Sequence, residues 1–161
     1  MGDRLIEKRV SEILHRCSPL VVTNWLARVK EARELNHLAL GDKERTGHLP
    51  KLIEDLVLRL NRPTAGSPQD SDAICSPAAV LHDELRFAQG YTPGMLVHES
   101  RFLQVTLFGT LKDNINALDF SLLLPDVMTI ADEVDAQLTQ TMASYMKLAN
   151  LPPQATKLAV A

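Results

Sequence analysis

The chain has 161 residues, of which 45% are hydrophobic and 23% are charged, and its formal net charge is −3. This length suits a single domain with a sizeable core. The slightly acidic balance argues against a dedicated nucleic-acid-binding surface, because such a surface normally carries a basic excess. No apolar run reaches the roughly 18 residues that a membrane-spanning helix needs, and the amino-terminal segment lacks the apolar core of a signal peptide. We therefore expect a cytoplasmic protein that does not enter a membrane.

The cysteines and histidines show no metal-binding spacing. Cys17 and Cys75 form no CxxC pair, so we expect both to be reduced rather than joined in a disulfide framework. The five histidines are scattered and form no HxxxH or HExxH pair. Zinc and di-iron sites in helical proteins use such spacings to place two ligands on one helix face. The sequence therefore predicts no metal site.

Apolar residues recur at helical spacing in the first half of the chain, and no segment alternates like a strand. The first predicted helix covers residues 3–17. Ser18-Pro19 then starts a second helix that runs to about residue 35, because serine caps a helix and proline suits its first position. A connection with a single turn of helix follows. A third helix covers residues 49–61, and the proline-rich and serine-rich stretch over residues 61–76 is predicted to be a loop.

The same pairing of a capping residue with proline opens the next two predicted helices. Ser76-Pro77 starts a fourth helix, which ends at Gly90, where glycine suits a left-handed terminal position. Thr92-Pro93 starts a fifth helix, which runs to about residue 115.

The sixth predicted helix is the longest, beginning at about residue 121 or 126 and ending at residue 150. We therefore predict one all-α domain over residues 1–150, a bundle of about six helices with a long C-terminal helix. A globin-like arrangement would also accommodate six helices of this size. Residues 151–161 are predicted to be a linker or a disordered tail.

The fourth predicted helix carries an unusual polar stripe. A helical wheel places Leu81, Leu85 and Ala88 at the centre of its apolar face. A second stripe follows the edge of that face at positions i, i+4 and i+7, and consists of His82, Arg86 and Gln89.

The fifth predicted helix places Glu99 inside its apolar arc. A buried carboxylate needs a partner, because an unpaired charge is costly to remove from water. The turn at Gly90-Tyr91 folds the fifth helix back against the fourth, so we predict a contact from Glu99 to Arg86 or to His82.

Three interpretations of this cluster remain open. It can simply fix how the two helices dock, line a pocket for a small molecule or signal, or carry out catalysis. Catalysis is the weakest interpretation, because no nucleophile lies at a recognisable spacing from His82. A haem bound through His82 is a further alternative, although Arg86 would be an odd neighbour for iron. We expect no cofactor and no enzymatic activity in this domain.

The last predicted helix carries a stripe with strict four-three spacing, formed by Val127, Ala131, Val134, Leu138, Thr141, Tyr145 and Leu148. This spacing is typical of a coiled-coil seam. Methionines beside the stripe would widen it, since methionine tolerates imperfect packing. We predict that the C-terminal half of the helix pairs with a second copy to form a homodimer, through Leu138, Thr141, Met142, Tyr145 and Leu148.

Three stretches resemble the RsbRD-type N-terminal domain, a helical domain at the front of bacterial sensor histidine kinases and of RsbR-like (RsbT co-antagonist) stress-signalling proteins. These stretches are "HLPKLIEDLVLRL", "HDELRFAQGYTPGMLVHESRFL" and the final helix ending in "SYMKLAN". The resemblance covers about residues 5–150. Its central pattern is matched by His82, Arg86, Gln89, Gly90, Tyr91, Leu96, Val97, Glu99 and Arg101. Ser100 departs from the pattern, because an aromatic residue is usual there.

The resemblance implies a sensory or regulatory input domain of a two-component or stress-signalling system, followed in the full protein by an effector such as a histidine kinase. The expected ligand or regulatory residues are His82, Arg86, Gln89, Tyr91, Glu99 and Arg101. The alternatives are a ligand-free dimerisation scaffold and a haem-binding, globin-like gas sensor.

Overall fold

The computed structural model describes residues 8–62 and 77–150, and of residues 77–81 and 83 only the backbone. Within these ranges the chain forms helices and one isolated β-bridge, so the predicted all-α bundle is confirmed. The predictions for residues 63–76 and 151–161 lie outside the described residues. The helices are α1 (Val10–Glu31), α2 (Arg33–Asn36), α3 (Asp42–Thr46), α4 (Leu49–Leu60), α5 (Pro77–Ala88), α6 (Pro93–Asp113) and α7 (Phe120–Ala149), with a 3₁₀ turn at Ile115–Ala117.

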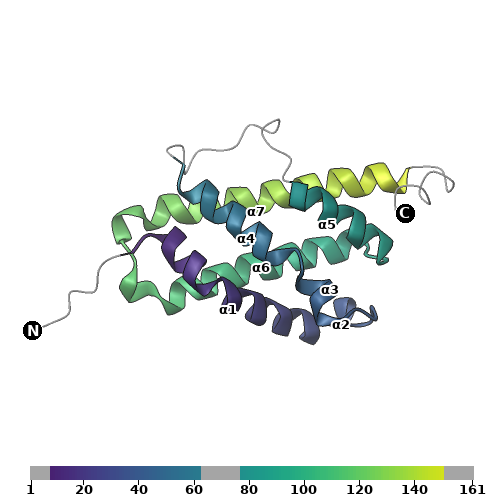
Figure 1. Ribbon diagram of the computed structural model, residues 1–161, viewed down its shortest axis with the longest axis horizontal. Coiled ribbons are helices and arrows are strands. Elements are labelled where there is room, and N and C mark those ends of the chain that lie inside the picture. Colours follow the sequence, from purple (N-terminus) through teal and green to yellow (C-terminus); the bar gives the residue numbers. More distant parts are fainter. Residues whose placement is uncertain (1–7, 63–76, 151–161) are drawn as a thin grey trace, which may run out of the picture.

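The long helix α7 spans one side of the bundle, and α4, α5 and α6 pack against it (Figure 1). Helix α1 lies on the opposite side and contacts α4 and α6. The core between these layers is filled by large apolar side chains that are almost completely buried, among them Ile13, Trp25, Leu60, Leu107 and Ile130. In the described part of the chain, no helix has the length and apolar character needed to cross a lipid bilayer.

The prediction of a helix break at Ser18-Pro19 is wrong, because α1 continues through Pro19. An internal proline costs about 3 kcal/mol by removing a hydrogen bond and crowding the preceding turn. Buried apolar side chains lie on both sides of it along one face, including Ile13, Val21 and Trp25. Each is worth roughly 1.5–3 kcal/mol when fully buried, so packing of the continuous face outweighs the local cost.

The connection between α1 and α4 contains two short helices: α3 matches the single predicted turn, whereas α2 falls where the second predicted helix was expected to end. Arg45 of α3 is buried, and its guanidinium donates to three backbone carbonyls. These acceptors are the oxygens of Leu35, Leu38 and Leu40, at 3.1, 2.7 and 3.3 Å. A single side chain therefore satisfies backbone groups that the irregular connection would otherwise leave unpaired.

The turn between α5 and α6 is built as predicted. Gly90 has φ +83°, the left-handed conformation that glycine adopts without a steric penalty. The Thr92 side chain accepts a hydrogen bond from the backbone N–H of Met95 at 3.3 Å, and Pro93 takes the first helical position. The turn thus sets α6 against the end of α5.

Helix α7 begins at Phe120, slightly earlier than predicted, and passes through Pro125. The side chain of Asp119 caps it by accepting from the backbone N–H of Ser121 at 2.9 Å. Two backbone hydrogen bonds also join this start to Lys8: the Lys8 N–H donates to Ala117 at 2.7 Å, and the Asp119 N–H donates to Lys8 at 3.0 Å.

Two glycine substitutions test this account of the backbone. Gly90→Ala should lower the free energy of unfolding by about 1–2 kcal/mol, because alanine is strained at a left-handed position. Gly109→Ala should raise it by roughly 0.5–1 kcal/mol, since Gly109 lies inside α6 and a Cβ there meets nothing within 4 Å. Urea unfolding of both variants measures the two changes, and changes of the same sign would contradict the assignment.

Candidate functional site

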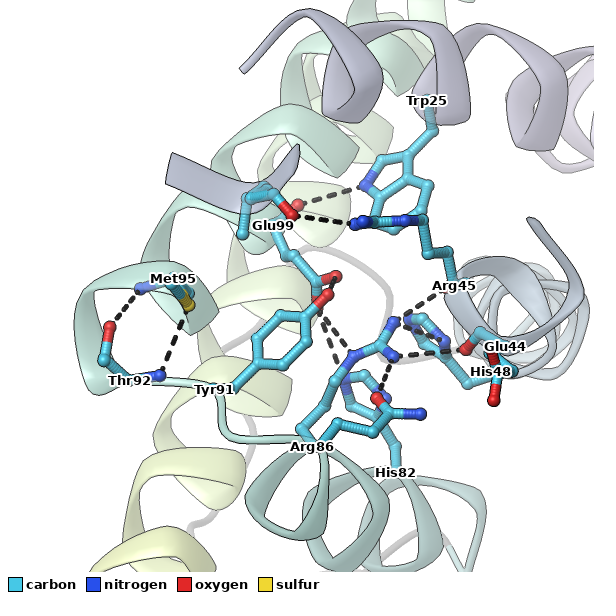
Figure 2. Close-up of polar contacts among 12 residues, drawn as sticks. Trp25, Glu44, Arg45, His48, His82, Arg86, Tyr91, Thr92, Met95 and Glu99 are labelled. Carbon is cyan, nitrogen blue, oxygen red and sulfur yellow. Dashed lines mark hydrogen bonds and ion pairs between the residues drawn. The ribbon is translucent and has the colours of Figure 1, made fainter. Parts of the chain in front are cut away.

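The centre of the site is Arg86 of α5, whose side chain has no exposed surface (Figure 2). Its Nε donates to Glu99 Oε2 at 3.1 Å, so the predicted contact between Arg86 and Glu99 is confirmed. Its Nη1 donates to Gln89 Oε1 at 2.7 Å. The ring of Tyr91 lies against the guanidinium, with 4.6 Å between Cζ and the ring centroid. Three of the predicted site residues, Gln89, Tyr91 and Glu99, therefore surround the Arg86 guanidinium.

Residues before α4 complete the shell of Arg86. Its guanidinium donates to the backbone oxygens of Glu44 and Arg45, at 3.2 and 2.7 Å, and its Nη2 lies 3.4 Å from His48 Nδ1. A guanidinium has five N–H donors in a rigid fork, and here five acceptors surround it. Arg86 therefore joins α3, the start of α4, α5 and α6.

The predicted apolar face of α5 is wrong. Leu85 is 46% exposed and Ala88 is also exposed, whereas Arg86 is fully buried and His82 is 8% exposed. The side chain of Leu81 lies outside the described residues. The polar stripe faces the core because the carbonyls and the carboxylate that Arg86 needs are there, and this network outweighs the usual preference for burying leucine.

Glu99 of α6 contacts α5 through its side chain and α1 through its backbone oxygen. Its side chain is buried, and Oε1 accepts a hydrogen bond from the Tyr91 hydroxyl at 2.7 Å. Its backbone oxygen accepts from Trp25 Nε1 of α1 at 3.2 Å. Burial raises the pKa of the Glu99 carboxyl, and the positive charge of Arg86 and the Tyr91 hydrogen bond oppose this rise. Burial also raises the pKa of Tyr91, so its hydroxyl stays a donor.

Two histidines stack beside this pair. The rings of His48 and His82 lie 3.8 Å apart between centroids, at 19° to each other. His82 Nε2 lies 4.0 Å from Glu99 Oε2, and its buried Nδ1 has no hydrogen-bond partner. Burial, followed by the charge of Arg86, lowers the pKa of His82 to about 3. Burial also holds the pKa of His48 well below its ordinary value, so both rings are neutral at pH 7.

His48, His82 and Glu99 bring one possible metal-ligand atom each within 4.8 Å of one another. The arrangement fits a divalent cation poorly for two reasons. The ring nitrogens of stacked imidazoles have lone pairs in nearly parallel planes, which do not converge on one ion. Arg86 also already bonds to Glu99 and contacts His48, so a fixed cation occupies the place of a metal. Spacing along the chain does not detect this cluster, because its members come from three separate segments.

A small cavity of about 40 Å³ adjoins the cluster. His48, His82 and Glu99 supply polar groups to its lining, and α7 contributes Val134, Gln137, Leu138 and Thr141. A volume of this size holds one or a few water-sized molecules, since one probe sphere needs about 10–15 Å³. The cavity therefore places the polar cluster directly against the long C-terminal helix.

Arg101 does not join the other predicted site residues. It is exposed and lines a separate hollow formed by α1, α2 and α6, together with Arg28 and Arg33. The turn of the helix explains this, because two positions beyond Glu99 correspond to a rotation of about 200°.

The predicted pairing stripe of α7 packs largely within its own bundle. Thr141 is 7% exposed, and Met142 and Tyr145 pack against the core. The ring of Tyr145 lies edge-on to Phe87 of α5, 5.2 Å between centroids. Leu148 is half-buried. The homodimer remains a prediction.

Sequence reasoning missed three members of the cluster: Trp25, Arg45 and His48. Arg45 and His48 lie in a segment that was expected to be a plain connection, and Arg86 makes its two shorter contacts there, at 2.7 and 3.2 Å, with backbone oxygens. A backbone acceptor carries no sequence signal.

Comparison of the chain with models of protein families, with curated proteins and with solved structures found no match.

Glu99→Ala should lower the free energy of unfolding by about 3–5 kcal/mol, because it leaves the buried Arg86 guanidinium without its carboxylate. Glu54→Ala is the matched control, since the Glu54 side chain is 62% exposed and pairs with the surface residue Lys51. It should change stability by less than about 0.5 kcal/mol. Urea unfolding measures both, and equal losses would show that the buried pair contributes nothing specific.

Proposed function

We propose that this chain is an N-terminal sensory or regulatory input domain of a bacterial signal-transduction protein such as a sensor histidine kinase. The domain itself is not an enzyme; it acts as a homodimer in the cytoplasm and controls an effector that follows α7. One observation carries the proposal: His82 and Glu99, the partner of the buried Arg86, line the same cavity as Leu138 and Thr141 of α7.

The coupling follows from this shared cavity. A signal that changes the contacts of His82 or Glu99 acts on the wall that faces Leu138 and Thr141. Packed helices respond to such changes by shifting between discrete arrangements, and translations of about 1–2 Å are sufficient to switch an interface. Because α7 is a single helix of 30 residues, a shift at Thr141 is carried to its C-terminal end.

The resemblance to the RsbRD-type domain supports the same function. His82, Arg86, Gln89, Tyr91 and Glu99 are part of the matched pattern, and all of them lie in or beside the cluster. The signal in this proposal is a small molecule, a protein partner or a change in protonation. Arg101 lies outside the cluster, so it would act on the surface of the domain.

Dimerisation in this proposal uses the outer side of the C-terminal half of α7. The inner side, with Thr141 and Tyr145, already packs within the chain. Met146 is 52% exposed and Leu148 is half-buried, so a second copy has apolar surface available there.

A ligand-free dimerisation scaffold is the second candidate. The complete hydrogen bonding of Arg86 favours it, because such a network can serve only to fix how the helices dock. Haem sensing receives less support. Pockets for ligands of drug or cofactor size occupy about 300–1,000 Å³, whereas the cavity beside His82 has about 40 Å³.

Filling the cavity separates the sensory proposal from the scaffold. Thr141→Leu adds apolar volume to the wall of the cavity and should alter amide chemical shifts of α7 from residue 141 to residue 150. Thr139→Leu is the control, because Thr139 is exposed on the same helix. Shifts confined to the immediate neighbours of residue 141 would favour the scaffold.

Light scattering at several protein concentrations tests the dimer. We expect the mass of two chains. Met146→Glu should weaken association by about tenfold or more, which corresponds to about 1.4 kcal/mol. Met128→Glu should leave it unchanged, since Met128 is equally exposed but lies near the other end of α7. A monomer at all concentrations would contradict this part of the proposal.

A further inference from the structure

The stacked pair of His48 and His82 has no role in the coupling described above except as part of the cavity wall. The two rings come from opposite sides of the cluster, His48 immediately before α4 and His82 from α5. At 3.8 Å between centroids the rings are in direct contact, with no space for water between them. The pair is therefore a contact between the start of α4 and α5.

We propose that this histidine pair is proton-sensitive: uptake of a proton separates the two rings, opens the contact between the start of α4 and α5, and so regulates the cavity that faces α7. The inference deepens the proposed function, since it names acidification as a signal at the same site.

The charges around the pair oppose a further cation. Arg86 of α5 and Arg45 of α3 are both buried and permanently positive. Glu99 of α6 is the carboxylate that faces them, and both its oxygens already accept hydrogen bonds, from Arg86 and from Tyr91. A protonated imidazole in the stack would therefore be a third positive charge beside one negative charge.

Among the described side chains, the other elements that line the cavity add no carboxylate beside the pair. Helix α1 contributes Trp25, whose N–H bonds to a backbone oxygen. Helix α7 contributes Gln137 and Thr141, which are uncharged. The buried Nδ1 of His82 has no partner in the closed arrangement, so a proton placed there would lack an acceptor. A buried charged ring without an acceptor is costly, whereas a neutral ring avoids that cost.

The direction of the pH effect follows from the histidines. Burial lowers the pKa of His82 to about 3, and the pKa of His48 is also lowered, so the closed state binds fewer protons than an open state in which the rings are solvated. The closed state is therefore fully stable above about pH 6.5 and loses stability as the pH falls from there toward 3. For each proton taken up, one pH unit changes the ratio of open to closed molecules by up to tenfold.

The ring of His82 lines the cavity, so its displacement acts on the side that faces α7. The volume of about 40 Å³ leaves little free space beside the ring. We therefore expect opening of the histidine pair to shift Leu138 and Thr141, which line the same cavity.

The single tryptophan of the chain provides the measurement. The Trp25 ring lies edge-on to His48 at 5.9 Å, and its N–H bonds to the Glu99 backbone oxygen, so its emission reports on the cluster. The experiment follows Trp25 emission, far-ultraviolet circular dichroism and the histidine ring signals in NMR from about pH 7.5 to pH 3.5. We expect the emission to change before helicity is lost, together with the ring signals of His48 and His82.

Variants identify the groups that take up the proton. His82→Gln and His48→Gln should each reduce the number of protons taken up and lower the midpoint by about one pH unit or more. His15→Gln should change neither, because His15 is exposed on α1. The inference would be overturned if Trp25 emission and helicity changed together. It would also be overturned if both cluster variants had the same midpoint as wild type. The wild-type protein gives a second test if the variants do not fold. The inference is overturned if the ring signals of His48 and His82 titrate at the ordinary pKa of histidine and Trp25 emission does not change.

Hydrogen exchange distinguishes failure of this inference from failure of the proposed function. In the acid state we expect faster exchange at α5, at the start of α4 and in α7 around Thr141. Faster exchange at α4 and α5 alone would overturn the regulatory step. The Thr141→Leu variant tests the coupling of the cavity to α7 at neutral pH, where the histidines are neutral, and therefore decides the proposed function independently.

Discussion

The fold depends on the burial of one permanently charged side chain. Removing the Arg86 guanidinium from water costs several kcal/mol, and the protein offsets this cost only if each donor finds an acceptor. Those acceptors come from α3, from the residue before α4, from Gln89 just after α5 and from α6. The position of each of these elements relative to α5 is therefore constrained by the same group. Replacing the Glu99 or Gln89 side chain would leave a charged donor buried without a partner.

Other features of the site follow from this constraint. Glu99 occupies an apolar helix face because its charge is needed to balance Arg86. Tyr91 follows the left-handed Gly90 and contributes both a hydroxyl to Glu99 and a ring face to the guanidinium. The same positive charge helps to keep His48 and His82 neutral. The cation that holds the helices together thereby also sets the protonation state of its neighbours.

The sequence was sufficient for the parts of the structure that depend on local spacing. A helical wheel predicted the burial of Glu99, and the Thr-Pro and glycine signals predicted the turn that brings Arg86 to it. Predictions failed where tertiary contacts determine the structure. Pro19 normally starts a helix, but packing on both sides kept α1 continuous.

The exposed Leu85 and the buried Arg86 reversed the expected faces of α5, because the wheel counts apolar side chains and not the backbone oxygens available to an arginine. For the same reason His48 was not recognised as part of the site. Its role depends on a segment whose path is set by carbonyl bonds to Arg45, and such bonds leave no trace in residue type.

The backbone link between Lys8 and the residues before α7 has a mechanical consequence. Hydrogen bonds on both sides of Lys8 connect it to Ala117 and Asp119, more than 100 positions away along the chain. Tension applied at Lys8 would therefore load the residues that precede α7 as well as α1. Lys8 thus ties the start of the first helix to the start of the last one, so a pull on either is shared between the two.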